Sequence, residues 1–432
     1  MKLGMISLGC AKNQIDTELF LGVATKYNLE LTNSLKEADI IVINTCGFIE
    51  SAKKEAIDTL LNITENKKNK IVIAMGCLVE RYLEDLKQAI PEVDIYFPIR
   101  DYDNIDSLFN KIINENKEYK MDYQNRYITT LPHSAYLRIS EGCNNKCSYC
   151  AIPLIRGPFR SRTLESLIDE AKTLANKGVK EITLIGQDTS RYGTDLNKGY
   201  DLADLLHEVS KINEFEIIRV LYLYPDEITD RIINEIKNNP KICKYFDIPI
   251  QHSSNKMLKA MNRRGSREFL ISLFNKIKTN IPEAIIRTTL IVGFPSEDIE
   301  DFNDLYAFVN DNKFNRLGIF TYSDEEDTKG FDMYPKVDEK IMKARLDKLM
   351  KLQATISLEN NKSYIGKIFK AIVDLYDYNK NAYLVRNYAY APDDVDGYIY
   401  MYQQFDNKIK SGDIINIEII EANEYDLYAK KI

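Results

Sequence analysis

The stretch Glu141-Gly142-Cys143-Asn144-Asn145-Lys146-Cys147-Ser148-Tyr149-Cys150 follows a short apolar segment and brings three cysteines close together. Iron–sulfur clusters are held by cysteine thiolates, normally four to a cluster. Three thiolates can hold three irons of a cubane cluster and leave the fourth iron without a protein ligand. An open coordination position on a metal is where chemistry takes place. The stretch therefore predicts a catalytic iron–sulfur centre.

Two other interpretations of this cysteine triplet are a structural zinc site and simple packing. A structural zinc site requires a fourth ligand and is usually built from pairs of Cys-x-x-Cys, whereas the triplet offers three ligands and one such pair. Free cysteines are also among the most buried residue types. The spacing favours the cluster over both.

The triplet, with Tyr149 before its last cysteine, resembles the signature of the radical S-adenosylmethionine (radical SAM) enzymes. The resemblance implies that the free iron binds the amino and carboxylate groups of S-adenosylmethionine. It also implies that one electron from the cluster cleaves the sulfonium and releases a 5′-deoxyadenosyl radical.

Length and composition indicate a globular protein of two or three domains: 432 residues, 44% apolar and 28% charged. The strongest apolar run, Ile40–Ile43, is too short to cross a bilayer, and the N-terminal apolar stretch stops at Ser7, too early for a secretory signal. Seven cysteines, an odd number, do not suggest a disulfide framework. We expect a cytoplasmic protein with no membrane association.

The formal net charge of −7 argues against non-specific nucleic-acid binding, which depends on Lys and Arg neutralising phosphates. An acidic enzyme is better suited to a basic protein partner, because complementary fields speed encounter.

The first part of the chain, residues 1–120, alternates apolar strands with amphipathic helices. Near-continuous apolar strands of this kind predict a parallel sheet covered on both faces. The expected strands are Leu3–Leu8, Ile40–Asn44, Ile71–Met75 and a weaker one near Ile95, and the expected helices are Gln14–Tyr27, Glu50–Asn66, Glu80–Ala89 and Ile105–Ile113.

A polar stretch, Asn114–Thr130, reads as a linker to a second α/β domain over residues 130–360. Six strand–helix units there amount to three-quarters of a TIM-like barrel, with a side gap that admits a large substrate. The expected strands are Tyr136–Ile139, Glu181–Ile185, Ile217–Leu223, Phe246–Pro249, Ile285–Val292 and Arg316–Phe320.

After residue 360 the helical period disappears, and residues 361–432 predict a small all-β barrel of the OB type. Many of its side chains are acidic, among them Asp374, Asp396 and Asp426, so docking of a basic protein loop fits it better than RNA binding. The expected strands are Val373–Tyr376, Ala382–Arg386, Gly397–Tyr402, Ile414–Ile420 and Tyr425–Ala429.

A second set of cysteines lies far apart in sequence but in equivalent places: Cys10, Cys46 and Cys77 each end an apolar strand. The crevice beyond the carboxyl ends of parallel strands is where ligands bind. Three thiols delivered to one crevice predict a second cluster, again with one open iron; the alternative is three small buried cysteines. Cys243 has no partner, and a packing role is expected for it.

Further candidates are polar residues at or within barrel strands, where cofactors tend to bind. Gln187 and Asp188 end one strand, with a polar turn as the alternative; Arg287 is charged within an apolar strand, with a structural ion pair as the alternative. His252 follows another strand and is a candidate for cofactor contact. Three arginines after the triplet are candidates to approach S-adenosylmethionine or an acidic target, with a solvated face as the alternative: Arg156, Arg160 and Arg162.

Taken end to end, the chain resembles the methylthiotransferase family, whose members have an N-terminal three-cysteine cluster domain, a radical SAM partial barrel and a C-terminal TRAM domain. Within that family the sequence around the cysteines is similar to the RimO branch, which modifies an aspartate on the small-subunit ribosomal protein numbered twelve. The resemblance is carried by Leu8–Asp16, Asn44–Glu55, Glu141–Cys143, Arg156–Arg162 and Gly293–Pro295.

The resemblance implies two 4Fe–4S clusters and S-adenosylmethionine as both methyl donor and radical source. The cluster at Cys143, Cys147 and Cys150 would generate the radical, and the cluster at the N-terminal cysteines would carry a sulfur that is methylated and then captured by the β-carbon of the aspartate. No other catalytic side chain is expected, Gln187, Arg287 and His252 would bind cofactor, and the two clusters should face one cavity. An electron donor such as flavodoxin or ferredoxin and a sulfur source are the further partners.

Two alternatives stay open at this point. The first keeps the chemistry but acts on an adenosine of transfer RNA, as in the MiaB branch. The second is a metal-stapled RNA-binding protein without catalysis, which predicts bound zinc and salt-sensitive RNA binding.

Overall fold

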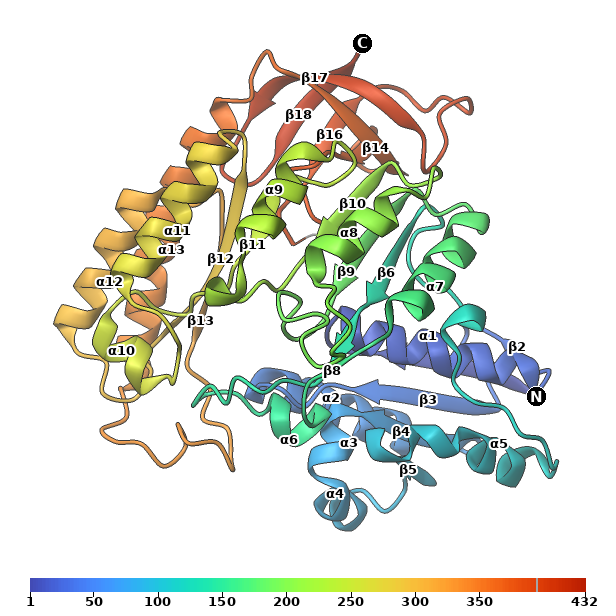
Figure 1. The fold of residues 1–432 in the computed structure, drawn as a ribbon. Helices are drawn as coiled ribbons and strands as arrows, with labels where there is room; N and C mark the ends of the chain where they lie inside the picture. Colours follow the sequence, from blue (N-terminus) through green and yellow to red (C-terminus); the bar gives the residue numbers. More distant parts are fainter. Residues whose placement is uncertain (394) are drawn as a thin grey trace.

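The chain forms three parts that follow one another in sequence (Figure 1). The computed structural model describes residues 1–393 and 395–432. A parallel sheet with its helices lies at the bottom of the view, a curved sheet with outer helices in the middle, and a small β-barrel at the top. The predicted α/β class and the three architectures are confirmed. No helix among these residues is both long and apolar enough to cross a membrane.

The N-terminal part is a five-stranded sheet in the order β2-β1-β3-β4-β5, with every ladder parallel. Its strands are apolar because separate hydrophobic clusters cover the two faces. The strands are β1 (Lys2–Ser7), β2 (Glu30–Leu31), β3 (Ile40–Thr45), β4 (Ile71–Gly76) and β5 (Ile95–Phe97). The helices are α1 (Ala11–Lys26), α2 (Glu50–Glu65), α3 (Cys77–Arg81), α4 (Leu83–Ala89), α5 (Ile105–Ile113) and the 3₁₀ turn η1 (Ile99–Asn104).

Two details of this part differ from the prediction. The helix expected over residues 80–89 is two helices, because the backbone at Tyr82 leaves the helical region (φ −127°, ψ 36°) and α3 already begins at Cys77. The short edge strand β2 was not predicted, since two residues carry no periodicity.

The central part is an open barrel of six parallel strands. Two three-stranded ladders, β6-β9-β10 and β11-β12-β13, are joined by an isolated bridge between Ile218 and Ile242. Among the described residues β13 does not pair back with β6, so the barrel stays incomplete, as predicted. The strands are β6 (Ser134–Arg138), β9 (Glu181–Ile185), β10 (Ile217–Val220), β11 (Tyr245–Asp247), β12 (Ile285–Val292) and β13 (Arg316–Thr321).

Helices cover the convex face of this barrel, and a two-stranded ribbon follows β6. The helices are α7 (Leu164–Asn176), α8 (Leu202–Ser210), α9 (Asp230–Asn238), α10 (Asn255–Ala260), α11 (Arg267–Asn280), α12 (Ile299–Asn312) and α13 (Glu339–Lys362). The ribbon is β7 (Ser140–Glu141) with β8 (Arg160–Ser161), and between them lies α6 (Ile152–Arg156). Two 3₁₀ turns, η2 (Tyr123–Asn125) and η3 (Pro225–Glu227), complete the part.

The C-terminal part is a closed barrel in the order β14-β15-β16-β18-β17, with β17 pairing back onto β14. It packs against the concave face of the open barrel, and the two share one hydrophobic cluster. The concave-face members of that cluster are Tyr136, Ile185, Leu221, Cys243, Tyr245 and Ile285. The strands are β14 (Ile368–Asp377), β15 (Ala382–Arg386), β16 (Ile399–Tyr402), β17 (Ile414–Ala422) and β18 (Leu427–Lys431).

Polar contacts fix the C-terminal barrel in this place. The Arg219 guanidinium on β10 donates to the carbonyl oxygens of Asn387, Tyr388 and Tyr390 at 3.3, 2.9 and 2.9 Å. The Tyr245 hydroxyl donates to Asp396 Oδ2 at 2.7 Å. The small barrel therefore closes one end of the open barrel, and the end nearest the N-terminal sheet is not covered by it.

Some of the acidic residues expected on the surface of the small barrel are buried ion-pair partners. Asp374 lies 2.9 Å from His133 Nε2 and 2.6 Å from Arg386 Nε. Asp396 is buried against Tyr245. The surface of this barrel is therefore less acidic than its composition suggests.

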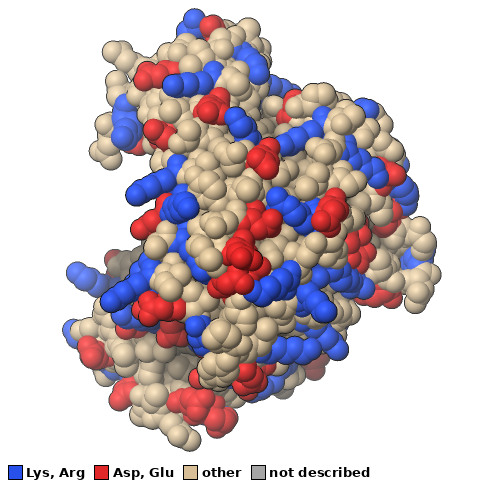
Figure 2. Space-filling view, turned by 90° about the vertical axis from the view of Figure 1, so that its left-hand side faces the viewer, with Lys and Arg blue, Asp and Glu red and all other residues tan. Residues whose placement is uncertain are grey.

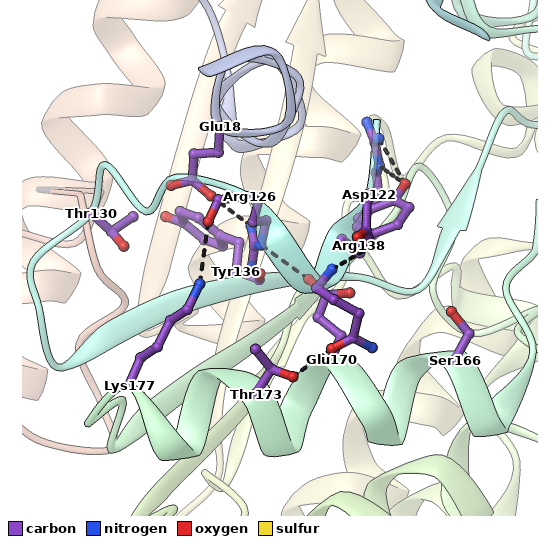
Figure 3. Close-up of polar contacts among 12 residues, drawn as sticks. Glu18, Asp122, Arg126, Thr130, Tyr136, Arg138, Ser166, Glu170, Thr173 and Lys177 are labelled. Carbon is purple, nitrogen blue, oxygen red and sulfur yellow. Dashed lines mark hydrogen bonds and ion pairs between the residues drawn. The ribbon is translucent and has the colours of Figure 1, made fainter. Parts of the chain in front are cut away.

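The predicted linker is firmly anchored (Figure 3). Its Arg126 is 1% exposed; Nη1 lies 2.6 Å from Glu18 Oε2 on α1, and Nε lies 3.1 Å from Glu170 Oε1 on α7. The same guanidinium donates to the carbonyl oxygen of Tyr136 on β6. One buried arginine thus ties the N-terminal sheet to the open barrel.

Candidate active site

The N-terminal cysteines follow three neighbouring strands. Cys10 comes after β1, Cys46 directly after β3 and Cys77 directly after β4, and these strands are adjacent in the sheet. Gly9 has a positive φ of 91°, and a side chain there would approach Cys46 Cβ to 2.9 Å. The loops that carry Cys10 and Cys46 are therefore in contact, which agrees with the expected convergence.

Asn13, on the first turn of α1, organises this edge of the sheet. Its Nδ2 donates to the carbonyl oxygens of Leu8 and Thr45 at 3.1 and 3.0 Å, and its Oδ1 accepts from Cys77 Sγ at 3.2 Å. Through these bonds one side chain connects the ends of β1 and β3 with the third cysteine.

The other triplet lies in the loop between β7 and α6. The backbone N–H of Asn145 donates to Cys143 Sγ at 3.5 Å, and Arg263 Nη1 donates to Cys147 Sγ at 3.8 Å. Asn145 Nδ2 also donates to Asp188 Oδ2 at 2.7 Å, which holds the loop against the end of β9.

Both triplets suit iron–sulfur ligation. All seven cysteines are free, and N–H or guanidinium donors point at three of the sulfurs, an arrangement that stabilises thiolates. Burial raises the pKa of Cys77 to about 12, against the opposing effect of Arg156, and burial also raises the pKa of Cys150. These thiols therefore stay protonated until a metal displaces the proton.

A single metal ion fits less well. Across residues 1–393 and 395–432, no group of three His, Cys, Asp or Glu side chains is close enough to hold one ion. The cysteines of a cubane bind different irons, so they stand further apart than the ligands of one ion.

Arg156 lies at the junction of the two triplets. It ends α6, the helix that begins just after Cys150, and it is 4% exposed. Its Nη2 donates to Cys77 Sγ at 3.3 Å and to Asn13 Oδ1 at 2.8 Å, and its Nη1 lies 2.7 Å from Asp16 Oδ2. Cys77 also packs with Ala151 and Ile155 of the same segment. The strand-end edge of the N-terminal sheet therefore lies against the helix that follows the second triplet.

A chain of buried polar contacts continues from Arg156 into the barrel. Asp16 Oδ1 lies 2.6 Å from Arg138 Nη1, which lies 2.9 Å from Glu141 Oε2; Glu141 Oε1 accepts from Gln187 Nε2 at 2.6 Å. Burial raises the pKa of Glu141, but Arg138 and Arg156 outweigh it and hold that pKa below its usual range. Gln187 Oε1 is buried and has no partner among the described residues, so it remains available to a bound group.

The remaining candidates lie in different surroundings. Arg287 Nη1 is 3.0 Å from Asp247 and its Nε 3.7 Å from Asp396, so it forms an ion pair beside the C-terminal barrel. His252 is fully buried, and its Nδ1 accepts the backbone N–H groups of Ser253 and Ser254, each at 3.0 Å. Cys243 packs in the concave-face cluster, as expected.

The three arginines after the triplet lie in different surroundings. Arg156 is buried at the junction, so the alternative of a solvated face is wrong for it, whereas Arg160 is exposed. Arg162 pairs with Glu170 and lies over the Tyr123 ring at 3.5 Å from its centroid, which is a structural role.

Sequence reasoning did not single out several residues of this site. Asn13 and Asp16 stand about one helical turn apart just after Cys10, and two polar residues at that spacing on one face of a predicted helix were an available signal. Arg263 gave no signal, because its contact with Cys147 joins residues that are distant in sequence.

A cavity of about 570 Å³ opens beside Cys10. Its wall includes Gln14 of α1, Tyr127 and Thr129 of the linker, and Asp393 of the C-terminal barrel. The N-terminal part, the linker and the C-terminal part of the chain therefore border the space next to this exposed cysteine.

The surface gives no large field of one sign on the face seen in Figure 2. Basic and acidic side chains are interspersed there, and a notch separates the upper lobe from the rest. This face offers no continuous basic track for nucleic acid, in agreement with the charge argument.

Comparison with known proteins gives a consistent picture. Residues 2–98 match "Uncharacterized protein family UPF0004", residues 137–309 match the "Radical SAM superfamily" and residues 365–432 match the "TRAM domain". The chain is 47% identical over 436 residues to a protein of Clostridium novyi (strain NT) named "Ribosomal protein uS12 methylthiotransferase RimO", covering 99% of this chain and 97% of that relative.

Solved structures share the fold at low identity. One is the cobalamin-dependent S-adenosylmethionine radical enzyme OxsB (TM-score 0.52, 12% identity, 82% of this chain); this chain spans only 56% of OxsB. Another is the radical S-adenosylmethionine methyltransferase TsrM from Kitasatospora setae (TM-score 0.55, 10% identity, 85% of this chain and 80% of that one).

Proposed function

The chain belongs to the RimO family of radical SAM methylthiotransferases, and from that premise we propose that it transfers a methylthio group to the β-carbon of an aspartate on ribosomal protein uS12. The observation that carries the proposal is the junction at Arg156. Two cysteine triplets, each short of one cluster ligand, adjoin there across a single short helix. A transfer that needs two metal centres at one target atom requires this adjacency.

We propose two 4Fe–4S clusters, one on Cys10, Cys46 and Cys77 and one on Cys143, Cys147 and Cys150, together with S-adenosylmethionine. When bound, these groups would supply the adenosyl radical and the methylthio group. The unactivated β-carbon of an aspartate calls for such cofactor chemistry, because the site offers no side-chain base able to deprotonate it.

The chain's own residues would position and shield this chemistry. Arg156 and Arg263 each direct a guanidinium at one cysteine sulfur, one for each triplet, which favours the thiolate form. The contacts from Asp16 through Arg138 to Glu141 keep the two parts of the chain together.

Of the cofactor-binding candidates, Gln187 is the one with a free buried acceptor, and we assign it to direct contact with S-adenosylmethionine. Arg287 and His252 are already engaged with the protein, so we assign them to shaping the wall of the cofactor site.

We further propose a division into an N-terminal methylthiotransferase cluster domain (1–120), a radical SAM domain (130–360) and a TRAM domain (361–432). The enzyme would work in the cytoplasm with an electron donor such as flavodoxin or ferredoxin and a separate sulfur source. Its net charge of −7 suits a basic ribosomal protein, met either free or in the small subunit.

Anaerobic iron and sulfide analysis tests the cluster assignment. We expect about eight irons in the reconstituted wild type and about four in each triple cysteine-to-alanine variant, because each triplet would hold one cubane cluster. Cys243→Ala is the matched control, since this cysteine lies apart from both triplets, and it should keep about eight. Four irons in the wild type, with the N-terminal triple variant unchanged, would contradict the two-cluster assignment.

Mass spectrometry tests the substrate. uS12 peptides incubated with reconstituted enzyme, S-adenosylmethionine, a reductant and inorganic sulfide as the sulfur source should gain a methylthio group on an aspartate. Unmodified uS12 together with methylthiolated transfer-RNA nucleosides would overturn the proposed function.

A further inference from the structure

Lys12 is a buried cation with no anionic partner. It lies on α1 two residues after Cys10 and is 8% exposed. Its Nζ sits 3.1 Å from the centroid of the Tyr222 ring. Over the described part of the chain this ammonium makes no ion pair, and Asp16, one turn further along α1, already pairs with Arg138 and Arg156.

The Lys12 ammonium lacks the anionic or hydrogen-bonding partner that a buried charge normally has. Buried charges in proteins are paired or hydrogen-bonded, because burial removes the water that stabilised them. A lysine has three N–H donors, and the face of an aromatic ring occupies only one side of it. The donors of Lys12 are therefore free for an anion that does not belong to this chain.

Tyr222 shows where that anion would sit. It follows β10 at its carboxyl end, the end of a barrel where active sites lie. Its φ of 64° is unusual for a bulky residue, and such conformations cluster at functional sites. Its N–H donates to Asp247 Oδ2 at 2.9 Å, and its carbonyl accepts from the N–H of Thr189, next to Gln187 and Asp188. Lys12 thus reaches from the N-terminal cysteines over the mouth of the open barrel.

We propose that Lys12 binds the side-chain carboxylate of the target aspartate. The inference rests on the proposed function and adds the residue that selects the substrate side chain. S-adenosylmethionine also carries a carboxylate, but the cofactor is expected at the triplet of Cys143, whereas Lys12 is fixed to the Cys10 end of the site. A carboxylate on Lys12 places its β-carbon beside the N-terminal triplet, and the neutral amide of asparagine would leave the ammonium unpaired.

The test compares two uS12 peptides that span the target position, one with aspartate and one with asparagine. We expect the full-length reconstituted wild type to bind the aspartate peptide about 100-fold more tightly, the range typical of a buried charge pair. In Lys12→Gln this preference should fall to within about threefold, mainly through weaker binding of the aspartate peptide, with a matching rise in KM.

Two further variants keep the test decisive. Lys26→Gln is the matched control: it lies at the other end of α1, with its Nζ 5.9 Å from the centroid of the Tyr119 ring, and should keep the wild-type preference. Lys12→Arg retains the charge and should restore part of the preference. Iron content reports whether each variant folds.

Each result has a defined meaning. Equal loss of both peptides in Lys12→Gln would make Lys12 a structural residue and overturn the inference. A raised KM for S-adenosylmethionine with unchanged peptide binding would assign Lys12 to the cofactor and also overturn it. If the wild type modifies no uS12 peptide, the proposed function fails and the inference falls with it; if it does and Lys12→Gln keeps the preference, only Lys12 is refuted.

Discussion

Arg156 is the residue whose loss should be felt at both cysteine triplets. Arg156→Met removes the partner of buried Asp16, Asn13 and Cys77, and breaking a buried pair from one side costs about 3 kcal/mol in the free energy of unfolding. We expect that loss in urea unfolding, together with a lower iron content. Arg160→Met, at an exposed neighbour, should change stability by no more than about 0.5 kcal/mol. Equal effects of the two variants would contradict the central place of Arg156.

His252 should remain neutral well below physiological pH. Burial lowers its pKa to about 3, so between this value and the usual 6.5 the unfolded chain takes up a proton that the native protein does not. This residue therefore stabilises the fold less as the pH falls through that window. The chain has three histidines, so a histidine-labelled NMR spectrum is simple to assign with His252→Gln. The His252 signal should not move between pH 8 and about 5; a midpoint near 6.5 would refute the prediction.

At the residue scale, the sequence was informative where the signal is local. The strand-end places of Cys10, Cys46 and Cys77 could be predicted because an apolar run of a few residues precedes each of them. Asn13, Arg263 and Lys12 could not, because what they contact is decided by packing between segments far apart in sequence.

The linker between α5 and β6 behaves as a structural element, because Arg126 lies between Glu18 and Glu170 (Figure 3). Arg126→Met leaves these buried carboxylates short of a partner and should cost about 3–5 kcal/mol, with faster hydrogen exchange in the linker. Lys177→Met is the control: this exposed lysine donates to the Arg126 carbonyl at 3.4 Å, and its loss should cost about 0.5 kcal/mol or less. A linker that exchanges as slowly in Arg126→Met as in the wild type would contradict this prediction.

Periodicity predicted which segments form strands and which form helices, but it predicted less well the residues at which they begin and end. The strand expected at Ile217–Leu223 ends at Val220, because the chain turns at Tyr222 into a conformation that no propensity indicates. The linker was also not predictable in this respect. Its polar sequence does not indicate that Arg126 is buried, because the partners of this arginine come from α1 and α7.

At the scale of the whole molecule, the C-terminal barrel is part of the core. A chain ending at residue 363 would expose the concave face that includes Tyr136, Leu221 and Tyr245, and would leave Arg219 without its three carbonyl acceptors. Uncovered apolar patches of this kind promote association. We expect the truncated protein to aggregate and to bind a hydrophobic dye, as measured by light scattering and fluorescence. A monomeric truncated protein that binds no dye would show that the two parts are independent.

The mutual covering of these two parts has a consequence for biosynthesis. The concave face is complete once Ile285 has been made, whereas its cover extends to Ala429 near the end of the chain. At typical rates of translation the apolar concave face therefore stays uncovered on the nascent polypeptide for roughly 10–30 s. We expect chaperones to bind the nascent chain during that interval and to leave it once the last strand has emerged.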